Sequence, residues 1–318
     1  MAPVLRPRQS RDFEKNQASR ASVLHQAQGA ESSCEQNAEG WIAFDLSQPI
    51  NNDIYGFCCG CRRSPVGDVM NVRVVSYNIH KCIGGVDRRY DPSRIVDVIG
   101  HYQPDLVLLQ EVVRYSRESP GMLQADVLGE ALEFSHRVWI PNVRVQQSRG
   151  YGNAILSRWP IIDSDNINLT IGPKKRRSAL YGKVRVPLPK NSSARTHSRT
   201  LHLFNLHLGL SGIERRLQLK KLLVHEHLDR VARATPVVVA GDLNDVWGTL
   251  GRQLMRPAGF RGTGRNPRTF PAYAPVRPLD SLYVRGEIEI DSLMSSRLAA
   301  ARQASDHLPL VADLTVSE

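Results

Sequence analysis

The chain has 318 residues, with 42 lysines and arginines against 31 aspartates and glutamates, which gives a net charge of +11. Its five cysteines offer neither a disulfide framework nor the paired ligands of a zinc site, because three are bunched at Cys58, Cys59 and Cys61 and the other two are isolated. No stretch approaches the roughly 18 apolar residues of a membrane span, and residues 1–30 lack the apolar core of a secretory signal. We therefore expect a cytoplasmic protein with reduced thiols.

Residues 1–70 differ in composition from the rest of the chain. They are rich in Gln, Ser, Asn, Arg and Glu and lack apolar periodicity, which predicts a disordered or weakly ordered extension. An over-long start is the alternative, since Met70 stands directly before the first strand-like run. Residues 71–318 have the length of one large domain, which we expect to be monomeric. The positive excess falls on this part, which favours a polyanionic partner such as nucleic acid or an anionic lipid headgroup.

The first elements after residue 70 alternate between strand and helix patterns. Residues 72–79 are rich in β-branched side chains and predict a buried strand. Asp91 and Pro92 are typical of a helix start, and an apolar pattern follows to Tyr102. Pro104 breaks this helix, and residues 106–109 predict the next strand.

Later elements include strands that follow one another without a helix between them, such as residues 154–156 and 201–208. A further helix is expected from Ser211. Its predicted apolar stripe consists of Ile213, Leu217, Leu222, Leu223 and Leu228. Pro236 ends this segment before a strand at residues 237–240. Mixed strands with helices outside them predict two packed sheets flanked by helices.

Most of the strand-like runs end in, or carry, polar side chains. In chain order the segments are VRVVSYNIH (72–80), LVLLQE (106–111), YGNAILSR (151–158), LHLFNLHL (201–208), VVVAGDLN (237–244), LDSLYV (279–284) and SDHL (305–308). An apolar segment that stops on a carboxylate or imidazole usually stops at a functional site. Together these segments supply the carboxylates, histidines and amides needed to bind a hard divalent cation and hydrolyse a phosphate ester.

Two features of this set have a direct chemical reading. Glu111 ends an apolar strand, where a bare carboxylate is costly unless a cation or a donor meets it. Asp242 and Asn244 are two residues apart and therefore share one face of an extended chain, where they can hold a water molecule and aim it at phosphorus. Asn205 and His207 share a face of their strand in the same way, whereas His202 lies on the opposite face.

The ordered series, and above all GDLN at 241–244 and SDH at 305–307, resembles the endonuclease/exonuclease/phosphatase superfamily. That group includes deoxyribonuclease I, exonuclease III-like repair nucleases, neutral sphingomyelinases and inositol polyphosphate 5-phosphatases. The resemblance covers residues 72–314. It implies an α+β fold, a four-layer αββα sandwich of two mixed β-sheets flanked by helices. It also implies a site at one edge of the sheets that depends on Mg²⁺, with Mn²⁺ as a substitute.

The resemblance also implies roles for single residues. Glu111 would be the principal metal ligand, with Asn78 and Asp306 beside it. Asp242 would activate or orient the nucleophile, and Asn244 would orient it and contact the phosphate. His207 would contact a phosphate oxygen, and Asp280 would fix the tautomer of His307. The further candidates for contacting substrate phosphate are Asn153, Asn205, Arg177, Arg215 and Lys81.

From the residues and the resemblance together, we expect a Mg²⁺-dependent phosphodiesterase that uses an in-line attack of water, with nucleic acid favoured as the substrate. A phospholipid or another phosphodiester or phosphomonoester is the alternative. Repair nucleases of the exonuclease III type carry QET and LDY where this chain has QEV (110–112) and LDS (279–281), which argues against a base-excision role. A catalytically inactive polyanion-binding domain is the alternative from another class, and metal-dependent turnover would distinguish the two.

Overall fold

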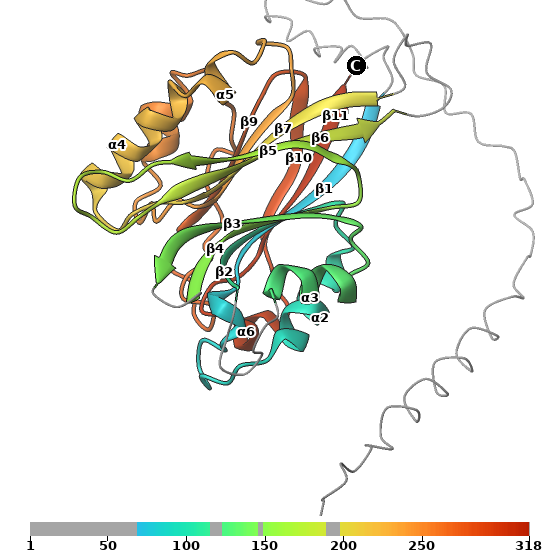
Figure 1. Ribbon diagram of the computed structural model, residues 1–318, viewed down its shortest axis with the longest axis vertical. Coiled ribbons are helices and arrows are strands. Elements are labelled where there is room, and N and C mark those ends of the chain that lie inside the picture. Colours follow the sequence, from blue (N-terminus) through green and yellow to red (C-terminus); the bar gives the residue numbers. More distant parts are fainter. Residues whose placement is uncertain (1–68, 115–122, 146–148, 189–197, 318) are drawn as a thin grey trace, which may run out of the picture. The chain divides into compact units, whose positions relative to one another are not determined.

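A computed structural model of the chain describes residues 69–114, 123–145, 149–188 and 198–317 (Figure 1). The extension expected at residues 1–70 lies outside this part except for its last two residues, so its disorder stays a prediction. Among the described residues, no helix is long and apolar enough to cross a membrane.

The described residues form two mixed sheets, as the sequence predicted. The six-stranded sheet has the order β10 (Ile288–Ser295), β11 (Leu310–Ser317), β1 (Val69–Asn78), β2 (Leu106–Val113), β4 (Arg149–Ser157) and β3 (His136–Val145). The five-stranded sheet has the order β5 (Ile161–Asn168), β6 (Ser178–Pro187), β7 (Ser198–His207), β8 (Val237–Asp242) and β9 (Asp280–Arg285). Of the strand pairs in the described residues, only β1–β2 and β7–β8 are parallel.

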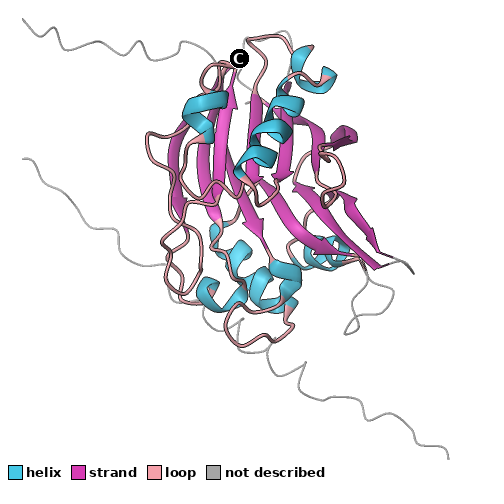
Figure 2. Ribbon diagram, turned by 90° about the vertical axis from the view of Figure 1, so that its left-hand side faces the viewer, coloured by secondary structure: helices cyan, strands magenta, loops and turns pink. Residues whose placement is uncertain are grey.

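Helices lie on the outer side of each sheet (Figures 1 and 2). On the side of the six-stranded sheet they are α2 (Pro92–Tyr102), α3 (Gln124–Ala131) and α6 (Ala301–Ala304), and on the other side they are α4 (Gly212–Leu223) and α5 (Glu226–Asp229). Two short helical turns complete the described part, namely η1 (His80–Cys82) and η2 (Gly251–Met255). The αββα sandwich is therefore confirmed.

Three apolar clusters fill the spaces between these layers. On β1, Val72 and Val74 face the cluster between the two sheets, whereas Val75 and Tyr77 face the cluster under α2 and α3. This is the two-residue alternation of a strand that is buried on both faces. The third cluster lies between the five-stranded sheet and α4.

The helix α2 forms as the sequence predicted, because the side chain of Asp91 accepts a hydrogen bond from the Ser93 amide at 3.0 Å and caps the helix. The predicted apolar stripe is confirmed for Leu222, Leu223 and Leu228, which belong to the core, and is wrong for its first two residues. Ile213 and Leu217 are 74% and 43% exposed, and the helix turns Leu219, Leu222 and the polar Gln218 inward. Gln218 is buried because its Oε1 accepts a hydrogen bond from the Gly209 amide, which fixes the loop after β7.

The strand directions bring five chemical segments to one edge of the sandwich. The parallel strands β1 and β2 end there on one sheet, and β7 and β8 end there on the other. Because β9 runs antiparallel to β8, it begins at the same edge. His207 pairs with Asp242 in register, and Asp242 pairs with Asp280, so three chemical residues lie side by side on neighbouring strands.

Candidate active site

A cavity of ≈ 460 Å³ opens at this edge. Eight of the residues singled out from the sequence line it, namely Asn78, Glu111, Arg177, His207, Asp242, Asn244, Asp306 and His307. Six further residues complete the lining: Lys175, Leu210, Val246, Phe270, Arg277 and Leu279. The edge of the sandwich therefore brings together acids, imidazoles, amides and cations from segments that are far apart in the sequence.

Asp242 lies at the centre of this arrangement and is buried. Its Oδ2 accepts a hydrogen bond from Asn78 Nδ2 at 3.0 Å, and its Oδ1 accepts one from the Asn244 amide at 2.9 Å. Gly241 makes this position attainable, since its φ of 138° and an ideal Cβ only 2.1 Å from the Leu206 carbonyl oxygen exclude a side chain there. Burial, together with the charge of Asp280, raises the pKa of Asp242 to about 6.

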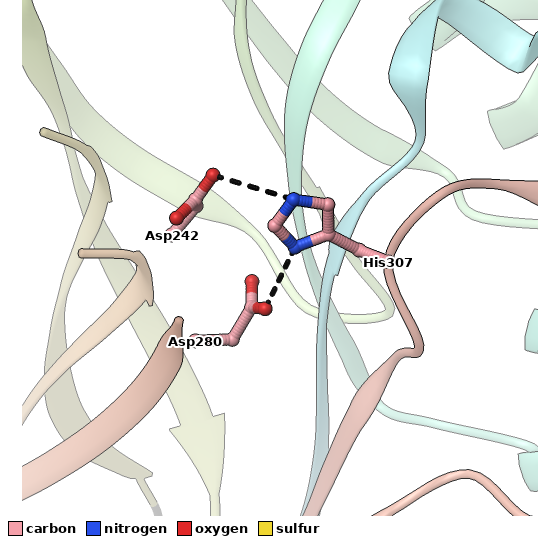
Figure 3. Close-up of side chains that lie close together, drawn as sticks. All are labelled: Asp242, Asp280 and His307. Atoms are coloured by element: carbon pink, nitrogen blue, oxygen red, sulfur yellow. Dashed lines mark hydrogen bonds and ion pairs between the residues drawn. The ribbon is translucent and has the colours of Figure 1, made fainter. Parts of the chain in front are cut away.

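His307 lies between two aspartates (Figure 3). Its Nδ1 is 2.9 Å from Asp280 Oδ2, and its Nε2 is 3.9 Å from Asp242 Oδ2. Because a carboxylate can only accept, the Nδ1–H donates to Asp280 and Nε2 faces the cavity. Thr269 Oγ1 donates to the same Asp280 oxygen and holds that carboxylate in place. Burial acts to lower the pKa of His307, but the charges of Asp280 and Asp242 outweigh it and raise the pKa to about 10.

His207 differs from His307 in its electrostatic environment. Burial, aided by the positive charges of Arg177 and Lys175, lowers its pKa well below the usual value, so the ring is neutral. Its Nδ1 is buried without a partner among the described residues, and its Nε2 is 3.6 Å from Asp242 Oδ2. One neutral imidazole, of His207, and one positively charged imidazole, of His307, thus face the same carboxylate of Asp242.

Glu111 faces the cavity from the end of β2 with a left-handed φ of 56°. Its side chain is only 18% exposed and forms an ion pair with Lys81. Burial acts to raise the pKa of Glu111, but the charge and hydrogen bond of Lys81 outweigh it and leave the pKa below its usual value. The carboxylate is thus ionised, and a cation already balances its charge.

Glu111 shares the cavity with two further side chains that carry oxygen atoms. Asp306 lines the same cavity, and so does Asn78, whose Oδ1 accepts a hydrogen bond from the His80 amide at 3.1 Å. Mg²⁺ prefers one or two carboxylates, further oxygens and water. In the described part of the chain, the one trio of candidate ligands whose atoms lie within 4.8 Å of one another is Asp242, Asp280 and His307. The hydrogen bond between His307 and Asp280 explains that trio without an ion.

Two predicted phosphate contacts need correction. Asn205 is fully buried between the sheets, and its Nδ2 donates to the carbonyl oxygens of Leu109 and Ala154, both at 2.9 Å. Its Oδ1 accepts from Gln110 Nε2 at 2.7 Å, so the amide has no capacity left for a phosphate. Asn153 is also fully buried, and its Nδ2 donates to the Asn205 carbonyl oxygen at 3.0 Å. Both amides join the two sheets.

Of the cationic candidates for phosphate contact, two lie at the cavity and one does not. Arg177 lines the cavity, and Lys81 reaches it through Glu111. Arg215 does not line it, because its buried guanidinium donates to the carbonyl oxygen of Leu210. Sequence reasoning did not single out Lys175 or Arg277, although Lys175 belongs to the basic run at residues 173–178.

Comparisons with known proteins find relatives in sequence and in fold. A model of the Endonuclease/Exonuclease/phosphatase family matches residues 75–307. The uncharacterized protein YbhP of Escherichia coli K12 is 28% identical over 258 residues, which cover 76% of this chain and 95% of YbhP. The structure of an endonuclease/exonuclease/phosphatase from Beutenbergia cavernae has a TM-score of 0.62 at 24% identity and covers 78% of this chain and 72% of that chain. TDP2 from D. rerio, complexed with single strand DNA product, has a TM-score of 0.54 at 18% identity and covers 77% and 98%.

Proposed function

This chain belongs to the endonuclease/exonuclease/phosphatase family, and from that membership and its site we propose that it is a Mg²⁺-dependent phosphodiesterase. One observation carries the proposal. Asp242 and His307, whose ring Asp280 holds, line the same cavity as the partly buried carboxylate of Glu111. Such a pairing suits a reaction in which a base and a hydrogen-bond donor act on one side of a phosphate and a cation acts on the other.

Glu111, Asp306 and Asn78 would hold the ion, which when bound neutralises phosphate charge and stabilises the leaving oxygen. Asp242 is the group that accepts a proton from the attacking water, because its raised pKa lies near the pH at which proton transfer works best. The protonated His307 donates a hydrogen bond from Nε2 to a phosphate oxygen, and Asp280 holds the ring for this task. Lys175, Arg177 and Arg277 attract the anionic substrate into the cavity.

We propose nucleic acid as the substrate. Two observations support this choice: the net charge of +11 and the similar fold of TDP2, which was obtained with a single-strand DNA product. A phospholipid or a sugar phosphate is the second candidate, since the same metal and base would serve either diester. We further propose that the protein acts in the cytoplasm as a monomer.

The test is turnover of bis-p-nitrophenyl phosphate by the full chain with Mg²⁺ or Mn²⁺, with EDTA as the control. We expect nitrophenolate release that EDTA abolishes and added Mg²⁺ restores. A panel of single-stranded DNA, duplex DNA, RNA, phospholipid vesicles and sugar phosphates then ranks the substrates by kcat/KM. If no phosphoester turns over with any divalent ion while polyanions still bind, the chain is a binding domain and the proposal fails.

A further inference from the structure

A second cavity, of ≈ 590 Å³, adjoins the catalytic one. Val246 lines both cavities, so they are neighbours along the same edge of the five-stranded sheet. The walls of the second cavity come from the loop after β8, from η2 and from residues 262–268. Two of these segments, η2 and residues 262–268, pack closely against Tyr283 of β9. An ideal Cβ at Gly251 or Gly262 would lie within 3.0 Å of the ring or hydroxyl of this tyrosine. The cavity is therefore a built feature of the fold.

The charge of this cavity is positive and unbalanced. Its lining includes four arginines, Arg252, Arg256, Arg265 and Arg268, and no acidic residue. In the part of the chain that the structure describes, none of the four guanidinium groups has a hydrogen bond or ion-pair partner. The adjacent Asp245 is buried and accepts hydrogen bonds from the Leu250 amide at 2.7 Å and from Thr249, and among the described residues it forms no ion pair with any of the four. Arginines without a counter-charge around one cavity favour an anion with several phosphate groups.

The same cavity also presents an aromatic ring. Trp247 is 82% exposed, although a tryptophan is costly to leave in water without a partner. Its neighbour Gly248 has a φ of 62°, a left-handed turn. Trp247 lines the second cavity and directly follows Val246, which lines both cavities. Sites for single-stranded nucleic acid combine a positive groove with aromatic rings on which bases stack.

We infer that this arginine cavity binds the nucleotides next to the scissile phosphate of a single-stranded nucleic acid. Its arginines contact backbone phosphates and Trp247 stacks on a base. The inference rests on the proposed function and adds to it the path that the nucleic acid takes beyond the catalytic cavity. A membrane surface is less suited to the site, because the arginines line a hollow, where a flat bilayer would not reach all of them. A small phosphomonoester would fill only the catalytic cavity.

The test compares the full chain with two variants of the cavity, Trp247→Ala and the double variant Arg252→Ala/Arg256→Ala. The double variant Lys220→Ala/Lys221→Ala is the charge-matched control, because these exposed lysines of α4 line neither cavity. Binding of a fluorescein-labelled single-stranded 12-mer is measured by anisotropy in EDTA at several salt concentrations. Turnover of bis-p-nitrophenyl phosphate and of the 12-mer is measured with Mg²⁺.

Each cavity variant should weaken 12-mer binding and its kcat/KM about tenfold, while turnover of bis-p-nitrophenyl phosphate stays within about twofold. The arginine variant should also reduce the slope of log affinity against log salt by about 1.4, or 0.7 for each lost phosphate contact. The lysine control should do neither. Unchanged 12-mer binding in both cavity variants would overturn the inference, and so would binding to anionic vesicles in place of the 12-mer. If the wild type binds the 12-mer through the cavity and hydrolyses nothing, the inference stands and the proposed function fails.

Discussion

The Nδ1 atom of His307 lies 2.9 Å from Oδ2 of Asp280, and this pairing directs the other ring nitrogen toward the cavity and Asp242. A histidine held in this way by a buried carboxylate keeps its proton, because the carboxylate stabilises the imidazolium more than burial destabilises it. Both the orientation and the charge of His307 therefore depend on Asp280.

Asp280→Asn should cut turnover about 10²-fold or more, since the amide removes the charge that raises the pKa of His307 and can stabilise the wrong tautomer. NMR titration of the His307 ring should show a lower pKa in the variant. Thr269→Val, which removes a donor to Asp280 and keeps the charge, should have a smaller effect on both quantities. A wild-type rate in Asp280→Asn would mean that the pair is structural.

Activity should follow a bell-shaped pH profile in kcat/KM. Asp242 must be deprotonated to accept a proton, and burial raises its pKa to about 6, so activity should fall as the pH drops through about 6. His307 must be protonated to donate, and its pKa is raised to about 10, so activity should also fall as the pH rises through about 10. His307→Gln should lose the alkaline limb and keep the acidic one. An acidic limb at the ordinary pKa of an exposed aspartate, near 4, would remove Asp242 from the proton transfer.

Glu111→Gln should weaken Mg²⁺ binding at least tenfold in calorimetric titration, because the substitution keeps the volume and removes the charge. The ion pair with Lys81 also changes the stability that burial alone would predict for the metal-free variant. A bare buried carboxylate would make the variant more stable, but here the carboxylate is paired, so the melting temperature without metal should be equal or slightly lower. Glu130→Gln, on the exposed face of α3, serves as the control and should change neither quantity. Unaltered Mg²⁺ binding in Glu111→Gln would place the ion elsewhere.

Lys81→Met should tighten Mg²⁺ binding severalfold, since the ammonium group and the ion compete for the same carboxylate. Lys175→Met is the matched control, because Lys175 lines the cavity without an ion pair to Glu111. It should leave Mg²⁺ affinity nearly unchanged and raise the KM for an anionic substrate. Equal effects of the two substitutions on Mg²⁺ affinity would mean that only the total charge of the cavity matters.

The strands and the chemical residues at their ends could be predicted from the sequence, and the reason is physical. A core strand that ends on Glu111 or Asp242 combines a strong apolar pattern with a side chain that is costly to bury, and both signals are local. The capped start of α2 at Asp91 is local in the same way. The structure therefore confirms these strands and this helix start.

The errors concern residues whose environment is set by distant parts of the chain. Asn205 has the two-residue spacing from His207 that a site residue would have, yet carbonyl groups of β2 and β4 surround its amide. The polar Gln218 is buried on α4 because it accepts a hydrogen bond from the Gly209 amide, whereas Ile213 lies on the exposed face of the same helix. Trp247 and the arginines beside it carried no recognisable spacing, because three separate segments build their cavity.

The corrected role of Asn205 leads to the last prediction. Asn205→Ala should destabilise the protein by about 2–4 kcal/mol, because two buried carbonyl oxygens, of Leu109 and Ala154, lose their donor and a polar contact between the sheets is removed. Urea unfolding gives the free energy of unfolding. Turnover and Mg²⁺ affinity, measured well below the melting temperature, should stay within about threefold, since the side chain does not line the catalytic cavity. Asn244→Ala offers the contrast, because Asn244 lines that cavity and its loss should lower turnover more than stability. A variant at position 205 that is fully stable but inactive would restore Asn205 to the site.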